Sequence, residues 1–390
     1  MNEYLHKINE ILINNNYIKN QYKFNIENRK NIIKEKENLS YKYFYSKLNI
    51  EKKKFINNYN KGKYNKNINT EFIDYIKKYY NDNYFDINNI YNNSFISLDI
   101  KYYIEQQIKY KYSYENDKLD IIIYSNNIVD SYYMSNIINI INFIKIIFNK
   151  DNKIKLIIYL TPLKKELNND YLSCQEINSG STLRNTIITI WRIEELEKVL
   201  IHELIHYLGL DIGHDNLVST KLRDKLKLNI NSVLNPNEAF TETFAIILYI
   251  YYITQNTNTL DIIKYQNEFN KQLLWSLYQS AKIIVFFKCF NELKDILNKE
   301  FNCQITQYTS VISYFIIKTS FIFKINNFFN FLKEINYNNY FDNTSYNLNK
   351  YFEFIINSLG NKSFNEKINK NIFLIKNKKL RNYKSMRMTI

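Results

Sequence analysis

The residues His202-Glu203-Leu204-Ile205-His206 form an H-E-x-x-H motif in a chain of 390 residues that contains only four histidines. On a helix, side chains four positions apart lie on one face, so the two imidazoles can bind one metal ion together. Glu203 then lies beside that ion, where its carboxylate can move protons. The motif therefore predicts a hydrolytic site for one Zn²⁺ ion, with His202 and His206 as ligands and Glu203 as general base.

The residues around the motif predict a buried helix over 192–208. Between 199 and 208 its apolar side chains occupy nearly every face, which is typical of a helix inside a domain. Gly209 follows at the position of a C-terminal glycine cap. Burial of three ionisable side chains without partners would destabilise such a helix, and a metal ion supplies one partner.

A third protein ligand has to come from outside the motif, because hydrolytic zinc sites use three protein ligands and a water. In one class of enzymes it is a histidine six residues after the second motif histidine, but position 212 is isoleucine. His214, two residues further along, is one alternative ligand. The other alternative is a glutamate on a following helix.

The segment Asn237-Glu238-Ala239-Phe240-Thr241-Glu242 resembles the Asn-Glu-x-x-x-acid motif of the thermolysin-like gluzincins. The resemblance implies that Glu238 binds zinc and that Glu242 orients His202 or His206 through a hydrogen bond. An arrangement with the two acids exchanged stays open. The connector from His206 to Glu238 is longer than in thermolysin, so we expect an additional excursion of the chain there.

Upstream of the motif, the pattern predicts a small mixed sheet. A strand over 119–124, a helix over 129–148 and a strand over 155–160 form an expected β-α-β unit. Two more extended runs, 175–182 and 186–191, enclose a turn or bulge at Gly180 and are expected at the sheet edge.

An edge strand before the metal helix would let an extended peptide pair with it and lie across the zinc. Asn178, Ser179 and Gly180 are therefore candidate substrate-binding positions, and a purely structural turn is the alternative. The predicted fold class is α+β, with a zincin-like metalloprotease core that combines this sheet, the active-site helix and a ligand helix. Mainly helical parts are expected on both sides of the core.

The expected organisation has four parts: a helical N-terminal region over 1–115, the catalytic core over 116–255, a helical subdomain over 256–360 and a loosely held basic tail over 361–390. The beginning of the sequence has no apolar segment typical of a signal peptide, and the apolar runs suit no membrane span. The three cysteines are odd in number and lie outside any C-x-x-C pattern, which favours a reducing compartment. We expect a cytoplasmic protein.

The net charge of +15 permits binding to nucleic acid, but the positive residues are spread along the chain and form no stripe that would indicate it. The residues that AT-rich codons encode are abundant, whereas there are only five glycines and two prolines. Part of the positive charge therefore reflects codon usage. The expected partner is a protein or peptide substrate, and the oligomeric state is not specified.

Short segments outside the motif carry a further pattern: Thr161-Pro162-Leu163-Lys164-Lys165, Asn178-Ser179-Gly180, Arg192-Ile193-Glu194-Glu195, Lys198-Val199 and Asn237-Glu238-Ala239-Phe240-Thr241-Glu242. Together with the H-E-x-x-H motif they resemble zinc metallopeptidases of nucleocytoplasmic large DNA viruses. The resemblance covers roughly residues 156–245. It implies a gluzincin-like protease of viral origin that acts in the host cytoplasm or in the virion.

Two rival functions are open. Peptide deformylase combines an H-E-x-x-H helix with an upstream cysteine ligand, and Leu172-Ser173-Cys174-Gln175 is weakly similar to its cysteine motif, although its glycine-rich motif is absent. The second rival is a basic scaffold, associated with virions or nucleic acid, that retains zinc without catalysis. A structural zinc site needs four protein ligands, and the sequence offers no evident fourth.

Overall fold

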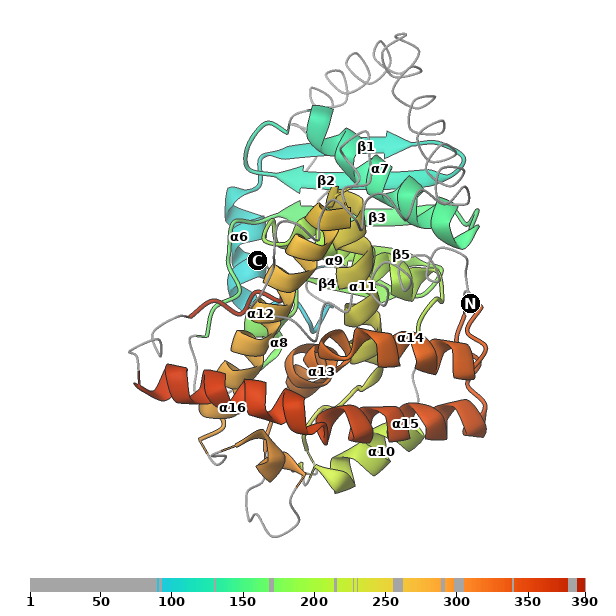
Figure 1. The fold of residues 1–390 in the computed structure, drawn as a ribbon. Helices are drawn as coiled ribbons and strands as arrows, with labels where there is room; N and C mark the ends of the chain where they lie inside the picture. The colour runs from blue at the N-terminus through green and yellow to red at the C-terminus, as the bar shows by residue number, and fades with distance from the viewer. Residues whose placement is uncertain are drawn as a thin grey trace.

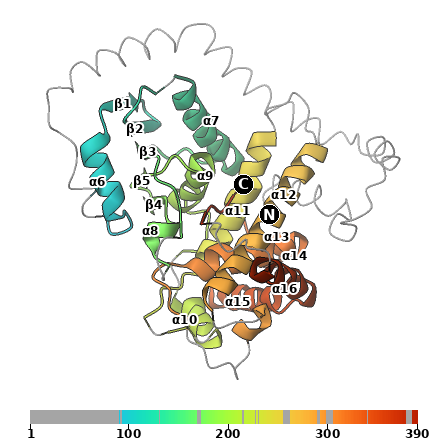
Figure 2. The same cartoon turned by 90° about the vertical axis from the view of Figure 1, so that its left-hand side faces the viewer.

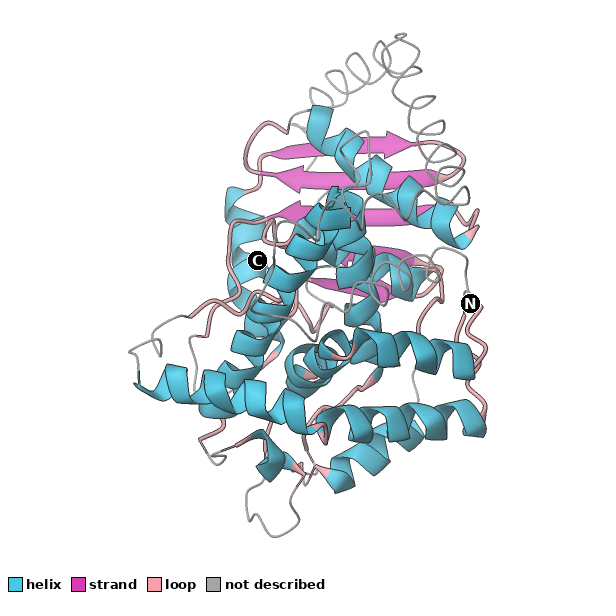
Figure 3. Ribbon diagram, viewed as in Figure 1, coloured by secondary structure: helices cyan, strands magenta, loops and turns pink. Residues whose placement is uncertain are grey.

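The computed structural model describes residues 90–389 apart from 91–92, 130, 168–171, 214–215, 227, 230, 255–261, 289–291, 298–304, 339 and 378–383. The helices expected before residue 90 lie outside the described residues, and so does the alternative ligand His214. Within the described part, the protein is helix-rich and contains one mixed sheet (Figure 3).

The sheet has five strands in the order β1-β2-β3-β5-β4. Its three central strands, β2, β3 and β5, are parallel, and β1 and β4 pair antiparallel at the two edges. The strands span Tyr110–Glu115 (β1), Leu119–Ser125 (β2), Ile154–Leu160 (β3), Gly180–Leu183 (β4) and Ile187–Ile190 (β5). The predicted α+β class and the small mixed sheet are confirmed.

The predicted β-α-β unit is present, because β2 and β3 run parallel and helix α7 (Ser131–Phe148) connects them. Their isoleucine-rich sequences place side chains on both faces of the sheet, and both faces are covered by helices. Helix α6 (Leu98–Gln107) covers one face, whereas α7 and α9 (Leu196–Tyr207) cover the other (Figure 2).

Strand β1 corrects one prediction, since residues 110–115 were expected to belong to the helical N-terminal region. The sequence Tyr-Lys-Tyr-Ser-Tyr-Glu alternates with a period of two, as a strand with one buried face does. Tyr112 is buried, and its hydroxyl accepts a hydrogen bond from the Val129 backbone N–H at 3.1 Å. The run contains no β-branched residue, so the tyrosine alternation alone indicates the strand.

Of the remaining helices, α8 lies between β3 and β4 in the sequence, and the others follow the sheet and pack beside and below it (Figure 1). The predicted ligand helix is α11, and the connector before it contains α10. These elements are α8 (Cys174–Ile177), α10 (Asn216–Lys225), α11 (Asn237–Thr254), α12 (Ile262–Phe286), the 3₁₀-helix η1 (Leu293–Ile296), the π-helix η2 (Ile312–Ile317), α13 (Lys318–Phe323), α14 (Ile325–Glu334), α15 (Ser345–Leu359) and α16 (Lys362–Asn377).

The expectation of a loosely held tail over 361–390 is wrong for most of that range. Residues 362–377 form α16, because isoleucines at helical spacing bury Ile368, Ile372 and Ile375 against the core. In residues 384–389 the side chains of Met386, Met388 and Thr389 are buried, and Met386 is completely buried. Within the described ranges, every helix is too short or too polar to span a bilayer.

Candidate metal centre

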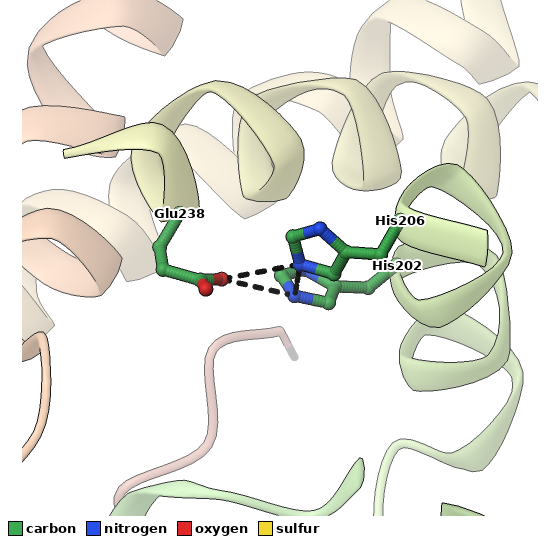
Figure 4. Close-up of side chains that lie close together, drawn as sticks. All are labelled: His202, His206 and Glu238. Carbon is green, nitrogen blue, oxygen red and sulfur yellow. Dashed lines mark hydrogen bonds and ion pairs between the residues drawn. The ribbon is translucent and has the colours of Figure 1, made fainter. Parts of the chain in front are cut away.

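Helices α9 and α11 bring His202, His206 and Glu238 together (Figure 4). The Nε2 atoms of His202 and His206 are 3.1 Å apart. Oε2 of Glu238 lies 3.3 Å from Nε2 of His202 and 3.4 Å from Nε2 of His206. The three atoms therefore form a nearly equilateral triangle.

The triangle has the size that a tetrahedral zinc ion requires. Bonds of about 2.0 to 2.1 Å at tetrahedral angles place neighbouring ligand atoms about 3.3 to 3.4 Å from each other. Oε2 of Glu238 is a buried atom for which the described residues supply no hydrogen-bond donor of suitable geometry, although both imidazoles are close. The donor set of two imidazole nitrogens and one carboxylate oxygen fits a zinc ion.

The first turn of α11 and Asn235 before it position the side chain of Glu238. Oδ1 of Asn235 accepts a hydrogen bond from the backbone N–H of Asn237 at 3.2 Å and so initiates the helix. The side-chain amide of Asn235 donates to Oε1 of Glu238 at 3.2 Å. Oε1 is thereby occupied, and Oε2 is the oxygen that lies nearest the two histidines.

A carboxylate lies close to Nδ1 of each imidazole, on the side of the ring away from the candidate metal position. Nδ1 of His202 lies 2.8 Å from Oε2 of Glu242, and Nδ1 of His206 lies 2.6 Å from Oδ2 of Asp211. A carboxylate at Nδ1 favours the tautomer whose Nε2 lone pair is available to a metal. The placement of Glu242 agrees with the role that the resemblance implied, whereas Asp211 is a site residue that the sequence reasoning missed.

Asp211 reaches His206 because the chain reverses at the end of α9. Gly209 adopts a positive φ of 65°, and the backbone N–H of Leu210 donates to the carbonyl of Ile205 at 3.0 Å, as in a Schellman motif. Arg184 then donates to Oδ1 of Asp211 at 2.5 Å. The available signal was the glycine cap, which returns the next residues to the last turn of the helix.

The cluster attracts positive charge. Burial by itself would lower the pKa of His206, but Asp211 and Glu238 outweigh it and raise that pKa well above its usual value. Burial would likewise raise the pKa of Glu238, and the charge of His206 instead holds it well below its usual range. Protons on the imidazoles and a divalent cation thus compete for the same place, so metal binding should release protons.

Glu203 lies in the same region and is held by strand β4. It is buried, and its Oε2 accepts a hydrogen bond from the hydroxyl of Thr182 at 2.7 Å. A Cβ atom added to Gly180 would lie 2.5 Å from Oε1 of Glu203, so a larger residue there would force this carboxylate to move. Thr182 is a further residue that the sequence reasoning did not identify.

The three candidate substrate-binding positions differ in their surroundings. Oδ1 of Asn178 accepts a hydrogen bond from Thr309 at 3.0 Å, and the carbonyl of Ser179 accepts one from the backbone N–H of Trp191 at 2.9 Å. Both residues precede β4 and make contacts within the fold. Gly180 begins β4 and contacts Glu203, so the structure brings only this one of the three to the site.

Tyr314 approaches the centre from the π-helix η2. Its ring centroid lies 6.3 Å from that of His202, and the side chain is buried. Burial raises the pKa of its hydroxyl well above the usual value, and the nearby carboxylates of Glu238 and Glu203 raise it further. The hydroxyl therefore stays protonated at neutral pH and can donate a hydrogen bond. Single π-turns are frequent at functional sites.

Cys174, the ligand that the deformylase alternative needs, does not belong to the cluster that could hold a metal within the described part of the chain. It lies in α8, where its Sγ is 3.7 Å from the carbonyl of Ser94. The fold and the site together define a helix-rich α+β protein with a cluster of two histidines and one glutamate.

The comparisons with known proteins give a viral relationship and no activity. The chain is similar to "Uncharacterized protein R210" of Acanthamoeba polyphaga mimivirus, with 29% identity over 166 residues. The matched region is 40% of this chain and 41% of that relative. No family model matches, and no solved structure matches. The similarity points to an origin among nucleocytoplasmic large DNA viruses.

Proposed function

We propose that this protein is a zinc-dependent metalloendopeptidase with a gluzincin-like core. The observation that carries the proposal is the triangle of Nε2, Nε2 and Oε2 atoms, whose edges of 3.1, 3.3 and 3.4 Å match a zinc coordination shell. His202, His206 and Glu238 would hold the ion. When bound, zinc supplies Lewis-acid chemistry that polarises a carbonyl and lowers the pKa of water.

Glu203 is the general base in this proposal. Glu203 follows His202 directly in α9, and its carboxylate contacts Thr182 and Gly180 of β4. From there it can accept the proton of the attacking water and deliver it to the leaving amine. The hydrogen bond from Thr182 occupies Oε2, which leaves Oε1 for the proton transfer.

The substrate would bind as an extended peptide along β4. The carbonyl of Ser179 and that of Leu183 both accept hydrogen bonds on the β5 side. Because alternate residues of a strand direct their backbone groups to opposite edges, Gly180 and Thr182 direct theirs to the outer edge. No backbone partner from the described residues occupies that edge. A peptide paired there would pass Glu203.

Tyr314 is the residue we assign to stabilise the oxyanion. Its hydroxyl stays protonated, and its ring lies beside His202, on an element that is separate from both metal-site helices. A donor placed where negative charge develops lowers the barrier of amide hydrolysis.

The test combines metal analysis with cleavage of a peptide library by the full chain. We expect one zinc ion per protein and zinc-dependent cleavage, and we expect Glu203→Gln to retain the zinc and to lose the cleavage. A Glu203→Gln variant with undiminished zinc-dependent cleavage would overturn the mechanism. Absence of bound zinc in the wild-type protein would overturn the function.

The scaffold alternative has less support, because the cluster offers three protein ligands within the described residues, whereas structural zinc sites are closed by four. It would require salt-sensitive binding of nucleic acid and no cleavage of any peptide. The viral relationship and the reducing environment indicated by the cysteine pattern suggest the host cytoplasm or the virion as the place of action.

A further inference from the structure

Segment 384–389 is an internal strap that the enzymatic proposal does not use. The backbone N–H of Leu167 donates to the carbonyl of Lys384, and that of Met386 donates to the carbonyl of Lys165, both at 2.8 Å. On its other side the segment contacts α12. The backbone carbonyls of the strap accept hydrogen bonds from four side chains of α12: Gln272, Trp275, Gln279 and Lys282.

The strap reaches the residue that precedes the active-site helix. The backbone N–H and the hydroxyl of Thr389 both donate to Oε1 of Glu195, at 2.5 and 2.6 Å. Lys165 donates to Oε2 of the same carboxylate at 2.9 Å. Glu195 has a left-handed backbone conformation with φ of 60°, which is unfavourable for a residue with a side chain. Its buried contacts thus stabilise a strained entry into α9.

The strap also touches the side chain that faces Glu242. Nζ of Lys198 lies 2.6 Å from Oε1 of Glu242 and 3.7 Å from Sδ of Met388. Oε2 of Glu242 is the atom that lies 2.8 Å from Nδ1 of His202. One carboxylate therefore joins Lys198 to His202, which lies one turn further along α9.

This carboxylate depends on Lys198 because both groups are buried, with side chains 2% and 1% exposed. Removing one partner of a buried ion pair leaves the other charge without compensation. Without Lys198, Glu242 would turn toward Lys318, the other buried lysine that acts on it. His202 would then lose the oriented carboxylate at Nδ1.

We propose that Lys198 is a positioning residue for the metal centre and that strap 384–389 holds it there, so that metal affinity depends on the docking of the strap. The inference rests on the proposed function, because it assumes that His202, His206 and Glu238 bind zinc. Its mechanism is the path from Met388 through Lys198 and Glu242 to His202.

The test measures zinc affinity by competition with a chelator and the visible spectrum of the Co²⁺-substituted full chain. Lys198→Met should weaken zinc binding about 10- to 100-fold, the effect typical of losing a partner behind a metal ligand, and should shift the Co²⁺ spectrum. Lys198→Arg keeps the charge and should restore part of the affinity. Lys145→Met is the matched control. Lys145 is a buried lysine of α7 whose Nζ donates to the carbonyl of Asn152.

Thr389→Val tests the strap separately, since it removes one donor to Glu195 and keeps the shape of the side chain. It should weaken zinc binding and speed amide hydrogen exchange in the first turn of metal-free α9. Thr254→Val, which alters a buried threonine at the far end of α11, should do neither. Should Lys198→Met fail to fold, Lys198→Arg tests the role of Lys198 by the same two measurements, and Thr389→Val tests whether the docked strap supports zinc binding.

Two results would overturn the inference, and they differ. If the wild-type protein binds zinc and both Lys198→Met and Thr389→Val keep its affinity and Co²⁺ spectrum, the strap does not position the centre. If the wild-type protein binds no zinc, the proposed function fails and this inference fails with it.

Discussion

Gly180 and Glu203 are in such close contact that a Cβ atom on the glycine would lie 2.5 Å from Oε1 of the glutamate and 2.9 Å from its Cδ. Glycine on β4 thus determines where the carboxylate on α9 can lie. The position of the proposed general base therefore depends on the lack of a side chain at Gly180.

Gly180→Ala should displace Glu203 and leave the proposed zinc ligands in place. A shift of about 1 Å in a catalytic group can reduce turnover about 100-fold, so kcat should fall by at least about tenfold with full zinc content. Steady-state kinetics and metal analysis check this result. Gly360→Ala is the control, because Gly360 follows α15 with an ordinary helical φ of −74°. Unchanged kcat in Gly180→Ala would show that Glu203 tolerates the displacement.

Asp211→Asn should weaken zinc binding about tenfold or more, because His206 would lose the negative charge behind its Nδ1. Equilibrium competition with a chelator measures the change. Asp151→Asn is the matched control, since Asp151 is a largely exposed partner of Lys118. Equal zinc affinities of the two variants would show that Asp211 does not support the metal centre.

Tyr314→Phe should lower kcat about 100-fold and leave KM and zinc content nearly unchanged, as expected for a donor that acts mainly in the transition state. Tyr340→Phe, which alters an exposed tyrosine, should have no effect. A parallel rise in KM with constant kcat would instead assign Tyr314 to substrate binding.

Lys282 should make the free energy of unfolding depend on pH. Burial lowers its pKa from 10.5 to about 7. Between these values the unfolded chain binds the proton and the folded protein does not, so stability rises with pH across this window. The free energy of unfolding of Lys282→Met should therefore exceed that of the wild type most below pH 7, and this difference should shrink toward pH 10.5. Denaturant unfolding at several pH values measures the difference, and a difference independent of pH would contradict the assignment.

The sequence predicted the elements whose signals are local. The apolar periodicity of 131–148, the β-branched runs of β2 and β3 and the glycine after α9 each act over a few residues, and each appears near its expected position. The spacing within H-E-x-x-H places two imidazoles on one turn, which the 3.1 Å between their Nε2 atoms reflects. The resemblance to gluzincins drew attention to Glu238 and Glu242.

Contacts that arise from the tertiary fold have no local pattern in the sequence that would predict them. Asp211 reaches His206 only through the reversal at Gly209, and Thr182 reaches Glu203 because β4 packs against α9. Thr389 and Glu195 are 194 positions apart in the sequence. The basic residues before Thr389 suggested an exposed end, yet Met386 and Met388 alternate with more exposed residues and are buried.

The hydrogen bonds from Thr389 to Glu195 also set an order of events during synthesis. A ribosome makes residues 196–207 long before residue 389, so the helix with both histidines emerges while the residue before it lacks these two donors. Domains can fold as they are translated, but the start of α9 gains these two hydrogen bonds only after residue 389 has emerged. In the proposed function, a nascent chain without residue 389 would be a peptidase whose active-site helix still lacks these two hydrogen bonds at its start.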